Sequence, residues 1–280
     1  MGHAGTLDPM ATGVLVVGIN KATRLLTYIV GTSKTYTATI RLGQSTITDD
    51  AEGDVVATAS AAAVTDEAIH DGVAALTGLI QQVPSSVSAI KVNGERAYAR
   101  VRSGEEVKLA ARPVTIHRFE VHGINREAGT GTDDAAVLDI DVTVECSSGT
   151  YIRALARDLG NALGVGGHLT ALRRTHVGPY SLEQARTLEQ LAEDLQVLEM
   201  SQAARALMPN RELTAEETTE ISFGRRIAAG AEPGSPGAAT ADHPAAAFAP
   251  DGSLVALLAD SGNFAKPVLV FAPGSGSRES

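Results

Sequence analysis

Two long stretches of alternating apolar and polar residues, at residues 112–124 and 135–146, constrain the fold more than any other feature of the sequence. Alternation of this length is typical of β-strands with one buried face, and only a polar loop separates the two stretches. A third alternating stretch lies at residues 34–43, and helical spacing occurs at residues 65–82 and 149–164. Because several neighbouring strands are joined by short turns, we predict an α+β fold: a mixed, mainly antiparallel sheet with flanking helices.

Five shorter segments also have a predicted structure. The continuous apolar run at residues 13–19 predicts a short buried strand, and residues 20–31 predict a helix after it. Residues 88–94 are predicted to form a strand that ends in an Asn-Gly turn, and residues 95–104 a short helix. Residues 167–182 are predicted to form another strand.

The character of the sequence changes near Pro209. Beyond it, a low-complexity segment at residues 228–244 precedes two short candidate strands, with an Asp-Gly turn. We therefore expect one large domain over residues 1–209 and a small β-rich module with a flexible tail over residues 210–280.

The chain is acidic, with a net charge of −10 from 23 basic and 33 acidic residues. Taken alone, this charge argues against a nucleic-acid partner. The basic residues are not spread evenly, however, and they gather at residues 21–41, 91–108 and 153–174. A folded chain could collect them on one face, or each could be an ordinary solvated charge.

The sequence also limits where the protein is found. Cys146 is the only cysteine, so neither an intrachain disulfide nor a cysteine-based metal site can form. No apolar run approaches the length of a membrane span, about 18 to 20 residues. The start of the chain has no secretory signal. We therefore expect a cytoplasmic protein with no membrane contact.

The polar loop at residues 2–13, GHAGTLDPMATG, holds one carboxylate, Asp8, with no second acid and no cysteine beside it. Asp before Pro commonly starts a turn, and on local sequence this structural explanation stays open. Elsewhere the histidines lack metal-ligand spacing, and the sequence has neither a phosphate-binding glycine loop nor a nucleophile elbow. Asp8 is therefore the one unusually placed acid.

A second unusual stretch, CSSGTYIRALARDLG, lies at residues 146–160. It places Tyr151 and Arg153 in the first turn of a predicted helix, where the helix dipole disfavours a cation. An arginine in that position often meets a specific carboxylate or phosphate. The alternative is an arginine that extends into solvent.

Five motifs, in this order, resemble the TruB family of tRNA pseudouridine synthases. They are GHAGTLDPMATGVLVVGINKATRLL, KTYTATIRLGQSTITDDAEG, SAIKVNGERAYARVRSGEEV, RPVTIHRFEV and CSSGTYIRALARDLGNALGVGGHLTALRRTHVGPYSL. The resemblance extends from Gly2 to about Pro209 and implies the pseudouridine synthase fold. The remainder resembles the small RNA-binding module of the PUA type that this family carries.

The resemblance assigns roles to individual residues. Asp8 corresponds to the catalytic aspartate, Tyr36 to the aromatic residue that stacks on the target base, and Arg153 to the partner of the aspartate. Leu172 and Tyr151 correspond to the walls of the substrate pocket. The residues that it implies along the RNA are His3, Lys21, Arg24, Lys91, Arg173 and Arg174.

The implied reaction is the isomerisation of uridine 55, in the T-loop of tRNA, to pseudouridine. It breaks the N-glycosidic bond and joins C5 of the base to C1′, so no atom is gained or lost and no cofactor or metal is required. One carboxylate can serve as the nucleophile or proton acceptor. The target base must be flipped out of its stack to reach it.

Two alternatives stand beside this stand-alone enzyme: an RNA-binding protein or tRNA chaperone without catalysis, and a guide-RNA-dependent subunit. The presence of Asp8, Tyr36 and Arg153 favours the enzyme, and the spelling HAGTLDPMATG argues against the guide-dependent relatives. The resemblance further implies a monomer. It also implies an N-terminal segment with a K-P-x-G loop before the GHAGTLDP motif, so we expect this sequence to be shortened.

Overall fold

A computed structural model describes residues 1–84, 91–92, 95–96, 110–127, 136–230 and 238–271. The chain forms two compact units, which we describe separately. The sheet unit comprises Gly5–Leu15 and Gly31–Ala185, and the terminal unit comprises Met1–Ala4, Val16–Val30 and Arg186–Ser280.

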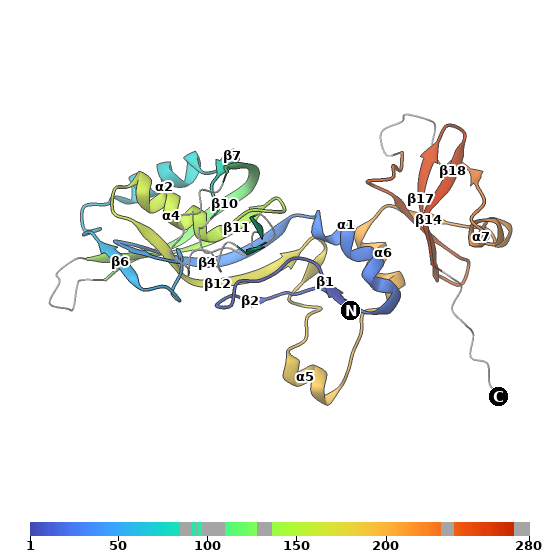
Figure 1. The fold of residues 1–280 in the computed structure, drawn as a ribbon, viewed down its shortest axis with the longest axis horizontal. Coiled ribbons are helices and arrows are strands. Elements are labelled where there is room, and N and C mark those ends of the chain that lie inside the picture. The colour runs from blue at the N-terminus through green and yellow to red at the C-terminus, as the bar shows by residue number, and fades with distance from the viewer. Residues whose placement is uncertain (85–90, 93–94, 97–109, 128–135, 231–237, 272–280) are drawn as a thin grey trace. The chain divides into compact units, whose positions relative to one another are not determined.

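The sheet unit is built on a seven-stranded sheet with the strand order β13-β12-β4-β11-β10-β7, and β2 lies beside β12 (Figure 1). Its strands are β2 (Thr12–Gly13), β4 (Lys34–Leu42), β7 (Gly78–Gln82), β10 (Arg112–Glu127), β11 (Val137–Cys146), β12 (Gly167–Val177) and β13 (Tyr180–Ser181). These neighbours pair in antiparallel fashion, except β2 with β12. The predicted α+β fold with a mainly antiparallel sheet is confirmed.

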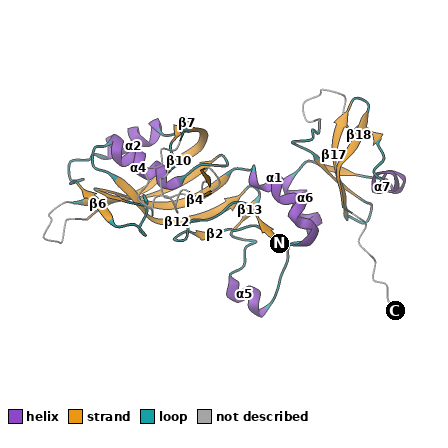
Figure 2. Cartoon of the chain, in the orientation of Figure 1, coloured by secondary structure: helices purple, strands orange, loops and turns teal. Residues whose placement is uncertain are grey.

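The helices α2 (Asp66–Ala75) and α4 (Ile152–Ala162) lie on one face of this sheet, as Figure 2 shows. That face is apolar. Buried and half-buried residues alternate along β11, as the sequence predicted. Ile140 at its centre pairs with Ile40 of β4, which in turn pairs with Leu169 of β12. These side chains and those of both helices form one continuous core, whose burial drives folding of the unit.

The opposite face of the sheet is polar. Arg41 makes two hydrogen bonds to the carboxylate of Asp139, at 2.7 and 2.6 Å, and the Thr39 hydroxyl donates to Asp141 at 2.7 Å. An open hollow of about 670 Å³ has Thr39, Asp141 and His122 among its lining residues. Asp8 and Arg153 do not line it.

A close approach at Gly160 fixes α4 against the start of β12. A Cβ atom at Gly160 would lie 2.2 Å from backbone atoms of Gly166 and Gly167. The Gly160 carbonyl also accepts hydrogen bonds from the amides of Val165 and Gly166. Only glycine permits this contact, so the helix that carries Arg153 has one position on the sheet.

The terminal unit contains a five-stranded sheet with the strand order β14-β16-β17-β18-β15. Its strands are β14 (Asn210–Glu212), β15 (Ile227–Ala228), β16 (Ala245–Phe248), β17 (Leu254–Ser261) and β18 (Phe264–Val270). The helices α6 (Met200–Leu207) and α7 (Ala215–Ser222) pack against this sheet. The predicted small β-rich module is confirmed.

The remaining elements are short. The terminal unit also contains β1 (Gly2–His3), β3 (Val17–Gly18), a 3₁₀ helix (Asn20–Leu25), α1 (Leu26–Val30) and α5 (Leu188–Glu193). The sheet unit also contains β5 (Gln44–Thr46), β6 (Val55–Thr58), β8 (Lys91–Val92) and β9 (Glu95–Arg96). Three antiparallel pairs join β1 with β3, β5 with β6 and β8 with β9.

The buried strand predicted over residues 13–19 is wrong. In the described part of the chain β3 pairs only with β1, so one of its edges is left open. Leu15, which precedes β3, and Val17, which belongs to it, are each 46% exposed. Apolar runs of this length do not reveal how many neighbours a strand has.

Two predicted helices also need correction. The helix predicted over residues 65–82 ends at Ala75, and β7 begins at Gly78, whose φ of 94° is incompatible with a continuing helix. In the second, predicted over residues 95–104, Glu95–Arg96 forms strand β9, and the other residues lie outside the described part.

The predicted boundary at residue 209 differs from the division into compact units. Helix α6 precedes this boundary but packs on β16 and β17. The Leu254 amide donates to the Ser201 hydroxyl at 3.0 Å, and the Arg205 guanidinium lies 3.7 Å from the centroid of the Phe248 ring. These contacts join residues before 209 to the C-terminal sheet. The division into a catalytic domain and an RNA-binding module stays a prediction.

Candidate active site

Asp8 lies in the loop from Gly5 to Val14, which we call the Asp8 loop. The turn that the sequence predicted is present, because the Ala11 amide donates to the Asp8 carbonyl at 2.9 Å, with Pro9 at the second position. This turn uses the backbone of Asp8 and leaves its carboxylate to another partner. The structural and the functional explanation of Asp8 are therefore compatible.

Helix α4 presents Arg153 as its second residue, and Tyr151, expected in the first turn, is the N-cap. The buried Gln82 side chain holds this end of the helix: its Oε1 accepts from the Tyr151 amide at 2.7 Å, and its Nε2 donates to the Tyr151 carbonyl at 2.9 Å. Gln82 ends β7, so the sheet fixes the start of α4. The helix dipole disfavours a cation at Arg153, which makes carboxylate partners necessary.

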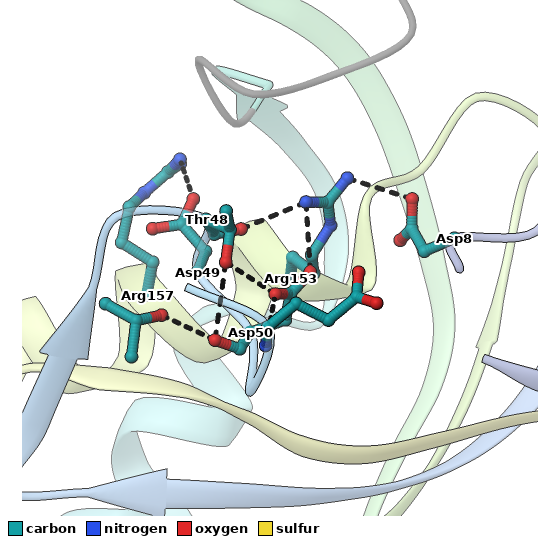
Figure 3. Close-up of polar contacts among 8 residues, drawn as sticks. Asp8, Thr48, Asp49, Asp50, Arg153 and Arg157 are labelled. Atoms are coloured by element: carbon teal, nitrogen blue, oxygen red, sulfur yellow. Dashed lines mark hydrogen bonds and ion pairs between the residues drawn. The ribbon is translucent and has the colours of Figure 1, made fainter. Parts of the chain in front are cut away.

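Figure 3 shows the guanidinium of Arg153 between Asp8 and the turn at residues 48–50, which we call the aspartate turn. Nη2 of Arg153 lies 2.9 Å from Oδ1 of Asp8. Nη1 lies 3.1 Å from Oδ2 of Asp50 and donates to the Thr48 carbonyl at 3.0 Å. One arginine thus joins the Asp8 loop, α4 and the aspartate turn.

The carboxylate of Asp50 is anchored on its other side as well. Its Oδ1 accepts from the Thr48 hydroxyl at 2.5 Å and from the Glu52 amide at 3.1 Å. The backbone carbonyl of Asp50 accepts from the Thr46 hydroxyl at 2.7 Å. Asp50 is therefore held in one orientation before it meets Arg153.

A second ion pair links the aspartate turn to α4. Arg157, one helical turn after Arg153, has its Nη1 3.2 Å from Oδ2 of Asp49. Asp49 has a φ of 60°, in the left-handed region that Asp tolerates better than most residues. Two adjacent carboxylates therefore reach two arginines on the same face of one helix.

The two aspartates that meet Arg153 differ in exposure. The side chain of Asp50 is 2% exposed and that of Arg153 8%, whereas that of Asp8 is 34% exposed. Asp50 can therefore fix Arg153, and Arg153 presents its outer nitrogen to Asp8. Within the described residues Oδ2 of Asp8 makes no hydrogen bond, which leaves one carboxylate oxygen for a substrate.

Two of the three predicted pocket residues, Tyr36 and Tyr151, lie near enough to this carboxylate to be affected by its charge, and the third, Leu172, lines the hollow of about 670 Å³. Tyr36 is half-buried on β4, and Leu172 is buried on β12, where it pairs with Ala38 of β4. Burial raises the pKa of the Tyr36 and Tyr151 hydroxyls, and the charge of Asp8 adds to both shifts. Asp8 is therefore close enough to both phenol groups to influence their ionisation.

Three of the predicted RNA-binding residues, His3, Lys21 and Arg24, are exposed in the terminal unit. Arg24 also has an intramolecular role, because its Nη1 donates to the Val270 carbonyl at 2.9 Å. An exposed cation can still meet a phosphate while it keeps one such bond. Their contact with RNA stays a prediction.

Two further predicted RNA-binding residues lie in the sheet unit. Arg173 is exposed on β12, with its Nη1 3.1 Å from the hydroxyl oxygen of Thr12 in the Asp8 loop. Lys91 belongs to β8, and its side chain lies outside what the structure describes.

The burial of Arg174 contradicts its predicted contact with RNA. This residue is 1% exposed, and its guanidinium donates to the carbonyls of Gly5, Thr6 and Val14. Successive residues of a strand point to opposite faces, so Arg173 reaches solvent and Arg174 the interior. Two adjacent arginines in a sequence do not reveal which of them is buried.

Sequence profiles of three domains match this chain. The profile of the TruB family pseudouridylate synthase N-terminal domain matches residues 1–152. The tRNA pseudouridylate synthase B C-terminal domain matches residues 153–212, and the C-terminal domain of tRNA pseudouridine synthase II matches residues 208–272. The chain belongs to the TruB family. It is therefore an enzyme of the pseudouridine synthase class, an isomerase.

Relatives in the TruB family are similar along nearly the whole chain. A tRNA pseudouridine synthase B of Arthrobacter sp. (strain FB24) is 82% identical over 275 residues, which cover 98% of this chain and 88% of the relative. Another, of Thermobifida fusca (strain YX), is 54% identical over 272 residues, which cover 97% of this chain and 89% of the relative.

Solved structures support the fold of this TruB-family chain. A structure of an H/ACA RNP bound to a substrate RNA containing 2′-deoxyuridine superimposes with a TM-score of 0.64 and 24% identity, over 98% of this chain and 77% of the other. A Cbf5-Nop10-Gar1 complex gives a TM-score of 0.62 and 24% identity, over 97% and 75% of the two chains. At this identity the likeness shows a shared fold alone.

The described residues of this TruB-family chain contain no group of three or more His, Cys, Asp or Glu residues that could hold a metal ion. Across the same ranges, no helix is long and apolar enough to cross a membrane.

Sequence reasoning missed three residues of the site: Asp50, Thr48 and Gln82. The segment TITDDAEG belongs to a motif quoted for the TruB resemblance, and its two adjacent acids were a signal that could have been followed. Nothing in the sequence indicates that Asp50 is buried and Asp49 less so. Gln82 gave no signal, because its role depends on the ends of β7 and α4 meeting.

Proposed function

We propose that this TruB-family protein converts uridine 55 in the T-loop of tRNA to pseudouridine, with Asp8 as the catalytic residue. One observation carries the proposal: Arg153 holds Asp8 at 2.9 Å, at the rim of an otherwise buried ion-pair cluster. An ion pair with a partly exposed carboxylate contributes little to stability, so stability alone is a poor explanation for this contact. Asp8 stays partly exposed, and its charge contributes to the raised pKa of both the Tyr36 and the Tyr151 hydroxyl.

The reaction rearranges one nucleotide without adding or removing an atom. The bond from C1′ to N1 of uracil breaks, the base turns, and a bond from C1′ to C5 forms, while the proton of C5 is lost and N1 gains one. Asp8 supplies the carboxylate, either as a nucleophile at C1′ or C6 or as the base that removes a ribose proton. Each route needs a carboxylate in a fixed place, which Arg153 and Asp50 provide.

The target base has to leave the RNA stack, which costs a few kcal/mol. Tyr36 offers an aromatic face for the flipped base. Leu172 offers an apolar wall on the neighbouring strand β12, two residues before Arg174, which pairs with Tyr36. Stacking and apolar contact with these side chains repay part of the cost of flipping. The raised pKa of Tyr36, caused first by burial, keeps its phenol neutral at physiological pH.

The names of the relatives support tRNA as the substrate of this protein, given 82% identity to a tRNA pseudouridine synthase B. The exposed cations His3 (when protonated), Lys21, Arg24 and Arg173 would follow the phosphates and give salt-dependent binding. We further propose that the protein acts as a monomer and without guide RNA.

The test is to incubate the protein with an unmodified tRNA transcript, without guide RNA, and to map pseudouridine chemically. We expect product at position 55, and none in a control transcript that carries cytidine there. Binding without product would instead indicate an RNA-binding protein or chaperone. Product that requires added guide RNA would contradict stand-alone action, and product at another uridine would contradict the T-loop assignment.

A further inference from the structure

We infer that Arg174 is a positioning residue, which holds the Asp8 loop and Tyr36 in register so that Asp8 meets the flipped base. This inference rests on the proposed function in one respect, namely that Asp8 acts on the substrate. It assigns Arg174 a role in turnover that is distinct from RNA binding.

The side chain of Arg174 joins the two ends of the Asp8 loop by three hydrogen bonds, which we call the clasp. Its Nε donates to the Val14 carbonyl at 2.7 Å, at one end of the loop. Its Nη2 donates to the Gly5 carbonyl at 3.2 Å and its Nη1 to the Thr6 carbonyl at 3.3 Å, at the other end. All three guanidinium nitrogens are therefore used on one loop, and Asp8 lies between the two points of attachment.

The backbone of Arg174 holds the same loop a second time. Its carbonyl accepts from the Val14 amide at 2.8 Å, and β2 pairs with β12 at Gly13 and Arg174. A Cβ atom at Gly13 would lie 2.1 Å from the Arg174 carbonyl oxygen, and Gly13 has a φ of 102°. The contact is thus too close for any residue except glycine.

Arg174 is also the cross-strand neighbour of the residue on which the target base is expected to stack. It pairs with Tyr36 in the register of β12 and β4, and its charge lowers the pKa of the Tyr36 hydroxyl, against the larger effect of burial. One residue therefore links the loop that carries the acid to the strand that carries the stacking ring. A change in its shape would alter the spacing between Asp8 and the base.

Burial of this cation is costly for folding, which makes a role in stability alone a poor explanation. Arg174 is 1% exposed, and in the part of the chain that the structure describes no carboxylate forms an ion pair with it. An apolar side chain would avoid the cost of removing the charge from water. Only a guanidinium offers a planar fork of donors that can hold three carbonyls at once.

The test is Arg174→Lys, which keeps the charge but provides one nitrogen in place of three. We expect the folded variant to bind tRNA with a KM within about twofold of wild type, while kcat falls by tenfold to about hundredfold, the penalty for a misplacement near 1 Å. Arg41→Lys is the matched control. It also replaces a guanidinium that makes more than one hydrogen bond, here two to the carboxylate of Asp139, but on the polar face of the sheet. The control should keep both kcat and KM.

A second variant covers the case in which Arg174→Lys does not fold. Gly5 has a φ of 88° and supplies a carbonyl to the clasp, so Gly5→Ala shifts that carbonyl without removing the cation. We expect a fall in kcat at an unchanged KM here too. A wild-type kcat in either folded variant would overturn the inference. Activity of Asp8→Asn is measured in parallel, because its survival would contradict the proposed function and not the clasp alone.

Discussion

Nη2 of Arg153 lies 2.9 Å from Oδ1 of Asp8, although 145 positions separate the two residues in the sequence. Three parts of the sheet unit produce this contact. The turn at Pro9 presents Asp8, the closely packed Gly160 fixes α4, and the buried Asp50 aims Arg153. The contacts that position this carboxylate therefore all lie within the sheet unit.

Arg153→Lys tests whether the fork geometry matters. Lysine retains the charge but cannot reach Asp8, Asp50 and the Thr48 carbonyl with a planar fork, so Asp8 loses its fixed orientation. We expect kcat to fall by about tenfold or more, with little change in tRNA affinity. Steady-state kinetics on a tRNA transcript give both values. Wild-type kinetics would show that the fork geometry of Arg153 is not needed for turnover.

Asp50→Asn tests the buried anchor. It leaves Arg153 with a desolvated charge and only the partly exposed Asp8 as a carboxylate partner, so we expect the free energy of unfolding to fall by about 3 kcal/mol. Urea unfolding measures the change. Asp49→Asn is the matched control, because Arg157 keeps a bond from its Nε to Asp158 at 2.9 Å. Equal losses in the two variants would contradict a special role for Asp50.

Arg173→Gln tests the predicted RNA contact next to the buried clasp. Because Arg173 is exposed, we expect KM to rise while kcat stays, and the slope of log Kd against log salt to fall by about one unit. Arg118→Gln is a control, since Arg118 is exposed but already paired with Glu120 at 3.0 Å. An unchanged salt slope in Arg173→Gln would remove this residue from the RNA interface.

The sequence contained enough information for the sheet and for the main pair of the site. Alternation predicted β4, β10 and β11. An arginine set against the helix dipole indicated a carboxylate or a phosphate partner, and the TruB resemblance is what paired Arg153 with Asp8. Burial was not predictable, because it depends on which segments meet in space. The roles of Asp50 and Arg174 therefore could not be assigned until the fold showed that both are buried.

Cys146 predicts a pH dependence of stability. Burial raises the pKa of its thiol from an ordinary value near 9 to about 11. Because the thiol has a higher pKa in the folded than in the unfolded protein, its contribution to the free energy of unfolding is complete below pH 9 and is lost as pH rises towards 11. Across this interval we expect the free energy of unfolding of wild type to fall by on the order of 2 kcal/mol more than that of Cys146→Ala. Urea unfolding at pH 8, 10 and 11 measures it, and parallel pH profiles for the two proteins would contradict burial as the cause.

Asp8→Asn is the most direct test of the central claim, that Asp8 is the catalytic residue. Asparagine keeps the size and the backbone turn but removes the charge that pairs with Arg153. The measurement is the single-turnover rate of pseudouridine formation at saturating enzyme, with tRNA affinity and melting temperature measured on the same preparation. We predict a rate at least about 10²-fold below wild type, with Kd for tRNA within about threefold and the fold intact. A folded Asp8→Asn protein that retained more than a few per cent of the wild-type rate would contradict the claim.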